Sequence, residues 1–508
     1  MNGPPVTVDP PPSGSAWLSS RLAAVLRLEP SAPALQFEDR WFRLGDLAAS
    51  VEALIAQLDA SGAEESTPVG VVLANRPEHV VAMIAVLSTR RCLVVLNATQ
   101  GTAGLQAEVE RARLDHVIVS ATDAPRIDGL ATLHIVDGPP TSPVLRQFPP
   151  VHGRIAANDA AIDMPTSGTT GPPKRIELSY TELGRSLRSA RRHDANADYD
   201  HVALSGAVAI VHQPLVHVSG LWRTLDALLS GRRIALIERF SVDAWHRAVL
   251  EHRPVTTSLV PAALRMVLDA RLPREDLVSL RSVVSSTAPL DATVAAQFED
   301  RYGVVVLTVY GATEFAGGVA GWTLADRLTF GDEKRGSVGR AQPGVRLRVV
   351  DDAENAVPPG TAGVLQVSVG KDAAWTTTTD IARIDGDGFV YIDGRRDTAI
   401  IRGGFKIDPA GVESVLRTHP AIHDACVVGR DDRRLGQVPV AVVELREAHD
   451  VDPAEVLGFV RERITGYSVP VAVLVVDKLP RTDALKVRRG AVAEMVGHAA
   501  APNAGPRP

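Results

Sequence analysis

The segment Pro165–Lys174 reads Pro-Thr-Ser-Gly-Thr-Thr-Gly-Pro-Pro-Lys, and it constrains this chain more than any other stretch. The exposed backbone N–H groups of a glycine-rich turn form a concavity that binds anions, and hydroxyl and ammonium groups complete such a site. The segment supplies all three kinds of group. It therefore predicts a loop that binds phosphate oxygens through Thr166, Ser167, Gly168, Thr169, Thr170, Gly171 and Lys174.

The spacing of the glycines excludes the nucleotide loop of P-loop NTPases. That loop has the pattern G-x-x-x-x-G-K-[S/T]. Here only Thr169 and Thr170 separate the two glycines, and Arg175 follows the lysine. A flexible Ser/Thr/Gly linker has a similar composition, so the pattern of the surrounding chain has to decide between a linker and a binding loop.

Short apolar runs alternate with segments of helical spacing on both sides of this loop. Val69–Leu73, Cys92–Leu96 and His116–Val119 are apolar almost throughout, as are strands buried on both faces of a parallel sheet. A second series of the same kind extends from His201 to Ala270. We therefore expect an α/β fold with two similar sheet subdomains and the phosphate loop near the crevice between them.

The pattern changes near residue 336 to short alternating strands between Gly, Pro and Asp turns, which indicates a small antiparallel subdomain. The last hundred residues or so read as a small α+β unit. A chain of 508 residues also exceeds what one core supports. We expect an N-terminal domain at 15–395, a hinge at 396–398, a mobile C-terminal lid domain at 399–497, and disordered ends at 1–14 and 498–508.

Charge and cysteine content argue against several classes of protein. The net charge is −6 and the basic residues are scattered, so nucleic acid is not an expected partner. Cys92 and Cys426 lie far apart, with no Cys or His at metal-binding spacing, which fits a reducing cytoplasm. We find neither the pattern of a signal peptide nor an apolar run of about 18 residues, so we expect no export and no membrane span.

A second candidate motif, Val309-Tyr-Gly-Ala-Thr-Glu-Phe, follows an apolar run. Ligands of α/β sheets bind at the carboxyl ends of strands, where we expect Tyr310 to Glu314 to lie. A carboxylate such as Glu314 is a hard oxygen ligand of the kind that Mg²⁺ takes beside phosphates. Taken alone, the motif fits an ordinary strand-to-loop turn equally well.

Together these segments resemble the adenylate-forming superfamily of acyl-CoA synthetases, peptide-synthetase adenylation domains and luciferases. The loop matches the family pattern T-S-G-T-T-G-x-P-K-G except at Arg175, and Tyr310–Glu314 matches Y-G-x-T-E. Three further resemblances start at Ser286 (G-G-A-P-L), at Thr378 (T-G-D, with Arg395 of G-R-x-x-D fifteen residues after Asp380) and at Leu479 (L-P-x-T-x-x-G-K-V). The resemblance covers about residues 160 to 490.

The resemblance implies roles in nucleotide binding for the matched positions. Glu314 is implied to bind Mg²⁺, Thr313 to contact the α-phosphate, and an acid–arginine pair to hold the ribose, for which a carboxylate suits a vicinal diol. Beyond the phosphate loop, the implied nucleotide-binding residues are Ser286, Thr287, Ala288, Tyr310, Gly311, Asp380 and Arg395.

In the lid domain the resemblance implies a catalytic lysine, a hinge and a glycine-rich strand. Lys486 aligns with the lysine that bridges the carboxylate and the α-phosphate, and Asp397 with the hinge. Gly403, Gly404 and Lys406 belong to the strand implied to face the active site after the lid rotates. Its glycines let a pantetheine arm pass close to the backbone.

The acyl pocket is implied to lie after the second βα series. His217 matches the gating position, and the pocket is lined by Ser219, Gly220, Trp222, Ala312, Phe315 and Gly317. Relatives that activate amino acids place an Asp just before the equivalent of Ser219, where this chain has Val218. An acid without an α-amino group is therefore favoured.

The implied function is that of an acyl-CoA synthetase, an AMP-forming acid–thiol ligase that uses ATP, Mg²⁺ and coenzyme A. Motif glycines are replaced at Arg175, Ser286, Thr287, Thr379 and Leu485. One alternative is therefore a variant that only converts a preformed acyl-AMP to the thioester. Two others are an acyl-AMP ligase that loads a carrier protein and a non-catalytic nucleotide-binding module.

Overall fold

The computed structural model describes residues 14–140, 142–148, 154–157, 159–165, 175–189, 202–370, 373–402, 405–432, 435–447 and 449–499. The predicted phosphate loop, Gly403, Gly404 and most of the predicted disordered ends lie outside these residues. The described chain divides into two compact units, which we call the N-terminal unit (up to Thr329) and the C-terminal unit (from Phe330). Each is considered separately.

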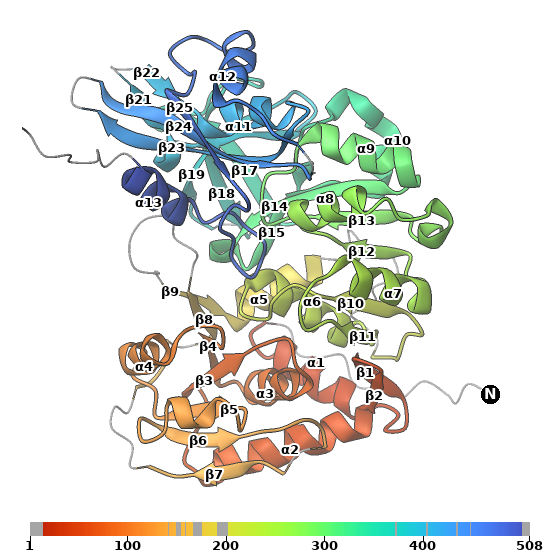
Figure 1. Cartoon of the computed structure of the whole chain (residues 1–508). Helices are drawn as coiled ribbons and strands as arrows, with labels where there is room; N and C mark the ends of the chain where they lie inside the picture. Colours follow the sequence, from red (N-terminus) through yellow and green to blue (C-terminus); the bar gives the residue numbers. More distant parts are fainter. Residues whose placement is uncertain are drawn as a thin grey trace, which may run out of the picture. The chain divides into compact units, whose positions relative to one another are not determined.

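The largest sheet of the N-terminal unit has seven strands in the order β7-β6-β5-β3-β4-β8-β9 (Figure 1). Its five central strands are parallel and its two edge strands antiparallel. The strands are β3 (Pro68–Leu73), β4 (Cys92–Asn97), β5 (His116–Val119), β6 (Thr132–Ile135), β7 (Val144–Arg146), β8 (Ala160–Pro165) and β9 (Arg175–Ser179).

Helices cover both faces of this sheet, as its apolar strands predict. Val71 packs into a core with α3 (Pro77–Ser88), whereas its neighbour Val72 packs on the other side with Leu105 of α4 (Thr102–Arg111). Consecutive strand residues point to opposite faces, so both faces must be apolar. The expectation of a largely parallel, doubly covered sheet is confirmed.

The second βα series is divided between two sheets and does not form a single second half. β10 (Val208–Val211) and β11 (Arg233–Leu236) join β1 (Pro33–Phe37) and β2 (Arg40–Arg43) in the order β10-β11-β1-β2. The strand expected from His201 begins only at Val208. Helices α1 (Trp17–Leu26), α2 (Leu44–Ala60), α5 (Tyr180–Ser189) and α6 (Val218–Leu229) pack in the core next to these strands.

The other part of the series forms a sheet of its own. β12 (Thr256–Ser258), β13 (Ser282–Ser285) and β14 (Val305–Ala312) are parallel, and β15 (Gly317–Gly321) is antiparallel to β14. Its helices are α7 (Val242–His252), α8 (Pro261–Asp269) and α9 (Ala292–Tyr302), followed by α10 (Leu324–Phe330). Side-chain caps fix two of these starts, because Ser241 and Asp291 accept hydrogen bonds from the first turns of α7 and α9.

The C-terminal unit begins with the antiparallel sheet that the sequence predicts. After the short β16 (Arg340–Ala341), its order is β17 (Val345–Val350), β18 (Gly363–Val369), β19 (Thr376–Ile384) and β20 (Val390–Arg395). The sequence did not reveal β19. It carries Thr379 and Asp380, and its polar run Thr-Thr-Thr-Thr-Asp lacks the alternation by which strands are recognised.

The last sheet has the order β22-β21-β24-β23, with β25 parallel to β24. Its strands are β21 (Ile400–Arg402), β22 (Phe405–Ile407), β23 (Ile422–Asp432), β24 (Gly436–Leu445) and β25 (Ala472–Val476), and its helices are α11 (Pro409–Arg417), α12 (Pro453–Arg461) and α13 (Arg489–Ala499). The boundary between the two units falls after Thr329, so β17–β20 belong to the same unit as this sheet. The proposed hinge at 396–398 therefore stays a prediction. Among the described residues no helix is both long and apolar enough to span a bilayer.

Candidate active site

The two residues that flank the predicted phosphate loop lie opposite each other. Pro165 ends β8, Arg175 begins β9, and the two are paired in the antiparallel ladder. β8 is the last parallel strand of the sheet and is buried almost throughout, so the loop follows the carboxyl end of a buried strand, where ligands of α/β sheets bind.

Arg175, at the last motif position, belongs to a buried ionic cluster. Its Nε lies 2.8 Å from Asp163 Oδ1, and its Nη2 donates to the Asp163 carbonyl at 2.8 Å. Its Nη1 lies 3.6 Å from Glu108 Oε1, and Arg154 contacts the second oxygen of Asp163 at 3.1 Å. Burial raises the pKa of Glu108, and the positive charge of Arg175 opposes that rise. The replacement for glycine thus has a local electrostatic role of its own.

We expected the Y-G-x-T-E motif to lie beyond the end of its strand. Part of it lies within the strand instead. β14 continues through Tyr310 and Gly311 to Ala312, where it pairs with β15. A Cβ atom on Gly311 would overlap the carbonyl of Gly317, so this pairing requires glycine. Thr313–Phe315 then form a single 3₁₀ turn that leaves Glu314 exposed.

Glu314 is suited to bind a divalent cation together with ligands from outside the protein. Among the described residues no group of three His, Cys, Asp or Glu side chains could hold a metal by itself. Mg²⁺ is usually bound by one or two carboxylates, with waters and phosphate oxygens completing its shell. A single exposed carboxylate therefore fits Mg²⁺ that arrives with ATP.

The segment Ser286–Ala288 follows β13 and includes a strained residue. Thr287 has φ = +78°, a left-handed conformation that suits glycine and is unusual for a β-branched residue. Its Oγ1 atom is buried without a hydrogen-bond partner. The backbone thus keeps the conformation expected of the family's glycine at this position, although threonine occupies it.

The predicted acyl-pocket residues His217, Ser219, Gly220 and Trp222 lie around the start of α6. A Cβ on Gly220 would overlap the carbonyls of Gln213 and Pro214, so the loop packs directly on the helix backbone. Asn75 fixes that loop: its Nδ2 donates to the carbonyl of Gln213 at 3.1 Å, and its Oδ1 accepts from the N–H of Leu215 at 2.8 Å. Sequence reasoning missed Asn75 because nothing in a lone Asn after a strand identifies its distant partners.

The pocket segments are joined by a second residue that the sequence did not reveal, Ser186 of α5. Its Oγ donates to the carbonyl of Ala316 at 2.9 Å and accepts a hydrogen bond from Trp222 Nε1 at 3.0 Å. Ala316 and Gly317 follow the Glu314 turn. The structure thus brings Trp222 to the segment that contains Ala312, Phe315 and Gly317.

In the C-terminal unit the two residues predicted to hold the ribose lie on neighbouring antiparallel strands. Asp380 of β19 lies directly opposite Arg395 of β20. Arg395 Nη2 donates to Thr379 Oγ1 at 2.7 Å. The threonine that replaces the family's glycine therefore orients the arginine.

Lys486 lies close enough to Arg395 to respond to its charge. Burial, and secondly the positive charge of Arg395, lower the pKa of Lys486. The loop that carries Lys486 is closed by hydrogen bonds between Thr482 and Lys486 and by the bridge Arg481–Val487. Leu485 has φ = +60°, again a left-handed residue where the family has glycine. Arg395 thus lies opposite Asp380 across two strands and near enough to Lys486 to lower its pKa.

Of the four remaining predicted positions, two are described through their backbone and two are not described. Asp397 lies in the 3₁₀ turn Arg396–Thr398 directly after β20, and Lys406 lies on β22, in both cases as backbone only. Gly403 and Gly404, which precede β22, are outside the described residues. The roles of hinge and coenzyme A contact stay predictions.

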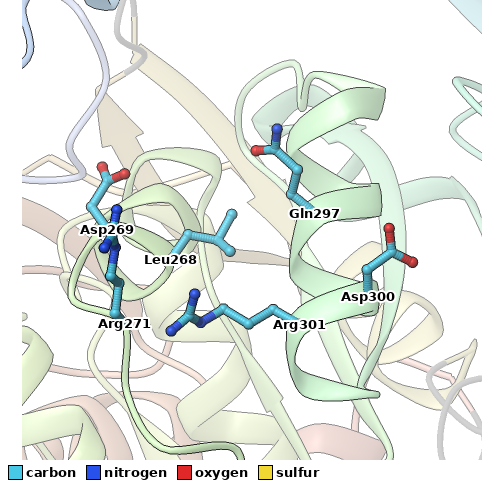
Figure 2. A pocket seen from close by; sticks show the side chains of 6 residues that line it. All are labelled: Leu268, Asp269, Arg271, Gln297, Asp300 and Arg301. Atoms are coloured by element: carbon cyan, nitrogen blue, oxygen red, sulfur yellow. The ribbon is translucent and has the colours of Figure 1, made fainter.

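An open hollow between α8 and α9 does not coincide with this site. Figure 2 shows its lining, the side chains Leu268, Asp269, Arg271, Gln297, Asp300 and Arg301. None of these belongs to a predicted motif, and the lining includes charges of both signs. We assign no ligand to it.

Residues 22–370 match the profile described as "AMP-binding enzyme", and residues 411–486 match that of the "AMP-binding enzyme C-terminal domain". This chain belongs to the AMP-binding enzyme family. The resemblance inferred from the motifs is confirmed.

Its relatives include several ligases of aromatic acids. An indoleacetate–CoA ligase of Aromatoleum aromaticum is 32% identical, over 92% of this chain and 96% of that protein. A feruloyl-CoA synthase of an Amycolatopsis species is 29% identical, over 93% and 97%. A 2-succinylbenzoate–CoA ligase of Bacillus pumilus is 28% identical, over 91% and 94%.

Solved structures agree on the fold. The o-succinylbenzoate CoA synthetase of Bacillus subtilis, in complex with its acyl-adenylate intermediate, has a TM-score of 0.76 and 25% identity, with 94% of this chain and 97% of that chain covered. MatB of Rhodopseudomonas palustris, bound to ATP, has a TM-score of 0.82 at 24% identity, over 94% and 98%. The α/β architecture with a small C-terminal domain is confirmed.

Proposed function

We propose that this AMP-binding enzyme joins an aromatic carboxylic acid to coenzyme A through an acyl-adenylate. The proposal is supported by the pairing of Asp380 with Arg395 across two strands and by the nearness of Lys486 to Arg395, because the adenylation that we propose needs an ammonium group near residues suited to a ribose. The relatives named above are CoA ligases. ATP and coenzyme A are cytoplasmic substrates, so we propose that compartment for the reaction.

In the first half-reaction a carboxylate oxygen attacks the α-phosphorus of ATP, and the bond to pyrophosphate breaks. Both reactants are anionic, so the protein has to gather negative charge and stabilise more of it as the reaction proceeds. Lys486, Lys174 and the hydroxyls of 166–170 supply positive charge and donors. Mg²⁺, when bound at Glu314, neutralises phosphate oxygens.

In the second half-reaction the sulfur of coenzyme A attacks the acyl carbonyl carbon, the C–O bond to AMP breaks, and the thiol loses its proton. The same carbonyl must meet Lys486 first and a thiol later. A hinge at Asp397 that exchanges Lys486 for the strand containing Gly403, Gly404 and Lys406 meets this requirement.

The start of α6 favours an aromatic acid without an ammonium group. Val216–Gly220 contains no carboxylate that would pair with a substrate ammonium, and Trp222 offers an aromatic surface. Indoleacetate, ferulate and succinylbenzoate, which name three relatives, are all aromatic acids. An acid of this class is the substrate that we propose.

The structure reduces the weight of the alternative functions. Two of the residues that replace motif glycines have local roles, because Arg175 pairs with Asp163 and Thr379 accepts a hydrogen bond from Arg395. These replacements therefore do not by themselves imply loss of ATP use. The named relatives transfer to coenzyme A, so neither a carrier protein nor a non-catalytic module is favoured.

The test is a panel of aromatic and aliphatic acids with ATP, Mg²⁺ and coenzyme A, with thioester and pyrophosphate both measured. We expect both products, in equal amounts, with at least one aromatic acid. Parallel reactions with synthetic acyl-adenylates separate the half-reactions. Thioester from the adenylates alone would replace our proposal by the non-adenylating variant, and pyrophosphate without thioester would replace coenzyme A by another acceptor.

A further inference from the structure

Ser186 connects three segments that are far apart in the sequence. It lies on the buried face of α5, and it bonds to Trp222 of α6 and to Ala316 before β15. α5, α6 and β15 also contact one another directly (Figure 1). A single hydroxyl thus lies where these three elements meet.

The direction of each hydrogen bond follows from the chemistry of the groups. An indole N–H only donates and a carbonyl only accepts, whereas a hydroxyl does both. Ser186 Oγ must therefore accept from Trp222 Nε1 and donate its proton to the oxygen of Ala316. Ala316 is fully buried and has φ = +59°, so its carbonyl has no water to replace this donor.

These bonds hold the indole of Trp222 in one orientation. The ring packs against the core on one side. Gly317 approaches the Nε1–Cδ1 edge of the ring so closely that a Cβ there would lie 3.3 Å from Trp222 Nε1 and 2.8 Å from Ser186 Oγ. Since the indole N–H is used by Ser186, the part of the ring that stays exposed is apolar.

We propose that Ser186 is a positioning residue for substrate specificity: it fixes the Trp222 indole as the wall that limits the length of the acyl group. The inference rests on the proposed function, in which Trp222 lines the acyl pocket. A fixed flat wall favours an acid whose ring ends against it and rejects longer acids. Without the hydroxyl the indole turns, and longer acids gain relative to shorter ones.

The test uses phenylacetate, 3-phenylpropanoate and 4-phenylbutanoate, acids that differ only in length. For each we measure kcat/KM and, by calorimetry, the Kd of the matching acyl-sulfamoyl adenosine, a stable mimic of the adenylate. In Ser186→Ala the ratio of the longest to the shortest acid rises about five-fold in both measurements, the factor expected for one lost hydrogen bond. Ser186→Thr, which keeps the hydroxyl, restores the ratio.

Two further variants separate positioning from general stability. Ser189→Ala removes another α5 hydroxyl, which donates to the Ser186 carbonyl at 2.7 Å, and leaves the ratio unchanged. Trp222→Phe removes the indole N–H, so Ser186→Ala adds nothing further in the double variant. Additive effects, or a melting temperature that falls while both length profiles stay the same, would overturn the inference. If the wild type formed no thioester while the Kd profile shifted, the proposed function would fail and the inference would stand.

Discussion

The guanidinium of Arg175 lies 2.8 Å from the carboxylate of Asp163, at a motif position where the family has glycine. Asp163 is almost completely buried, and so is the nearby Glu108. Removing one partner of a buried ion pair leaves an uncompensated charge, whereas exposed pairs contribute little. The cluster therefore makes the base of the predicted phosphate loop depend on a residue that family comparison alone would class as a defect.

From this cluster we predict that Arg175→Gly, although it restores the family motif, lowers the free energy of unfolding by about 3 kcal/mol. Urea denaturation measures the change. Arg146→Gly is the matched control, because its pair with Asp128 has both side chains about half exposed, and it changes stability by less than about 1 kcal/mol. Equal stability of Arg175→Gly and wild type would mean that Arg154 alone satisfies Asp163.

Lys486 should matter for only one of the two half-reactions. In Lys486→Ala we expect pyrophosphate release from ATP to fall by at least about a hundred-fold, while thioester formation from synthetic acyl-adenylate is retained. Lys478→Ala, which removes an exposed lysine of the same unit, should leave both rates unchanged. Equal losses in the two half-reactions would argue against the proposed alternation of Lys486 with the glycine-rich strand.

The lowered pKa of Lys486 adds a prediction on pH. The ammonium form is the one that stabilises phosphate charge, and it loses its proton at a lower pH than an ordinary lysine. The adenylation rate should therefore fall at alkaline pH, below 10.5, while the thioester half-reaction from acyl-adenylate does not follow the same curve. Rates of both half-reactions between pH 7 and 10 test this difference.

Thr287 offers a test of backbone strain. A β-branched residue at φ = +78° costs about 1 kcal/mol or more relative to glycine, and its buried hydroxyl lacks a partner. Thr287→Gly should raise the melting temperature by a few degrees. Thr287→Ala removes the hydroxyl but keeps the Cβ, so it should recover only part of that gain. A destabilised Thr287→Gly would show that contacts of the threonine methyl group outweigh the strain.

His134 should make folding stability depend on pH. It is fully buried, its Nδ1 lies 2.9 Å from Gln57 Oε1, and burial lowers its pKa to about 3. Its folded pKa is below the unfolded value, so the unfolded state binds more protons, and stability is lost as pH falls from about 6.5 toward 3.

Between pH 7 and pH 5 this loss amounts to roughly 2 kcal/mol for a single histidine of this kind. His134→Gln should lack that part of the loss, although it is less stable at pH 7. Urea denaturation at both values measures it, with His449→Gln, at an exposed position, as the control. An unchanged difference between the two pH values would exclude His134 as the cause.

Apolar periodicity predicted the elements of this fold better than their assembly. It predicted short antiparallel strands from about residue 336 and a small α+β unit in the last hundred residues, and the structure has both. It missed the polar strand β19, and it could not show that β10 and β11 join strands from the beginning of the chain. Pairing between distant strands depends on the whole sheet and leaves no local pattern.

The candidate site shows the same limit. Motifs with fixed spacing identified Glu314, Arg395 and Lys486. Ser186 and Asn75 have no such pattern, because each acts through partners that only the fold brings close. The family comparison also marks Thr379 as a departure, and the reason for it, a bond to Arg395, becomes visible only when two strands are paired.

β1 lies between β11 and β2, with Leu35 beside Ile234, and this placement ties the pocket to the beginning of the chain. Residues 33–43 carry no catalytic signature, yet they complete the sheet that contains β10 and β11. These are the strands that α6 connects. A fragment that began after residue 43 would expose an unpaired edge of β11 and uncover the apolar side of α6. Every motif would still be present in such a fragment, but the helix that carries His217 and Trp222 would have lost its support.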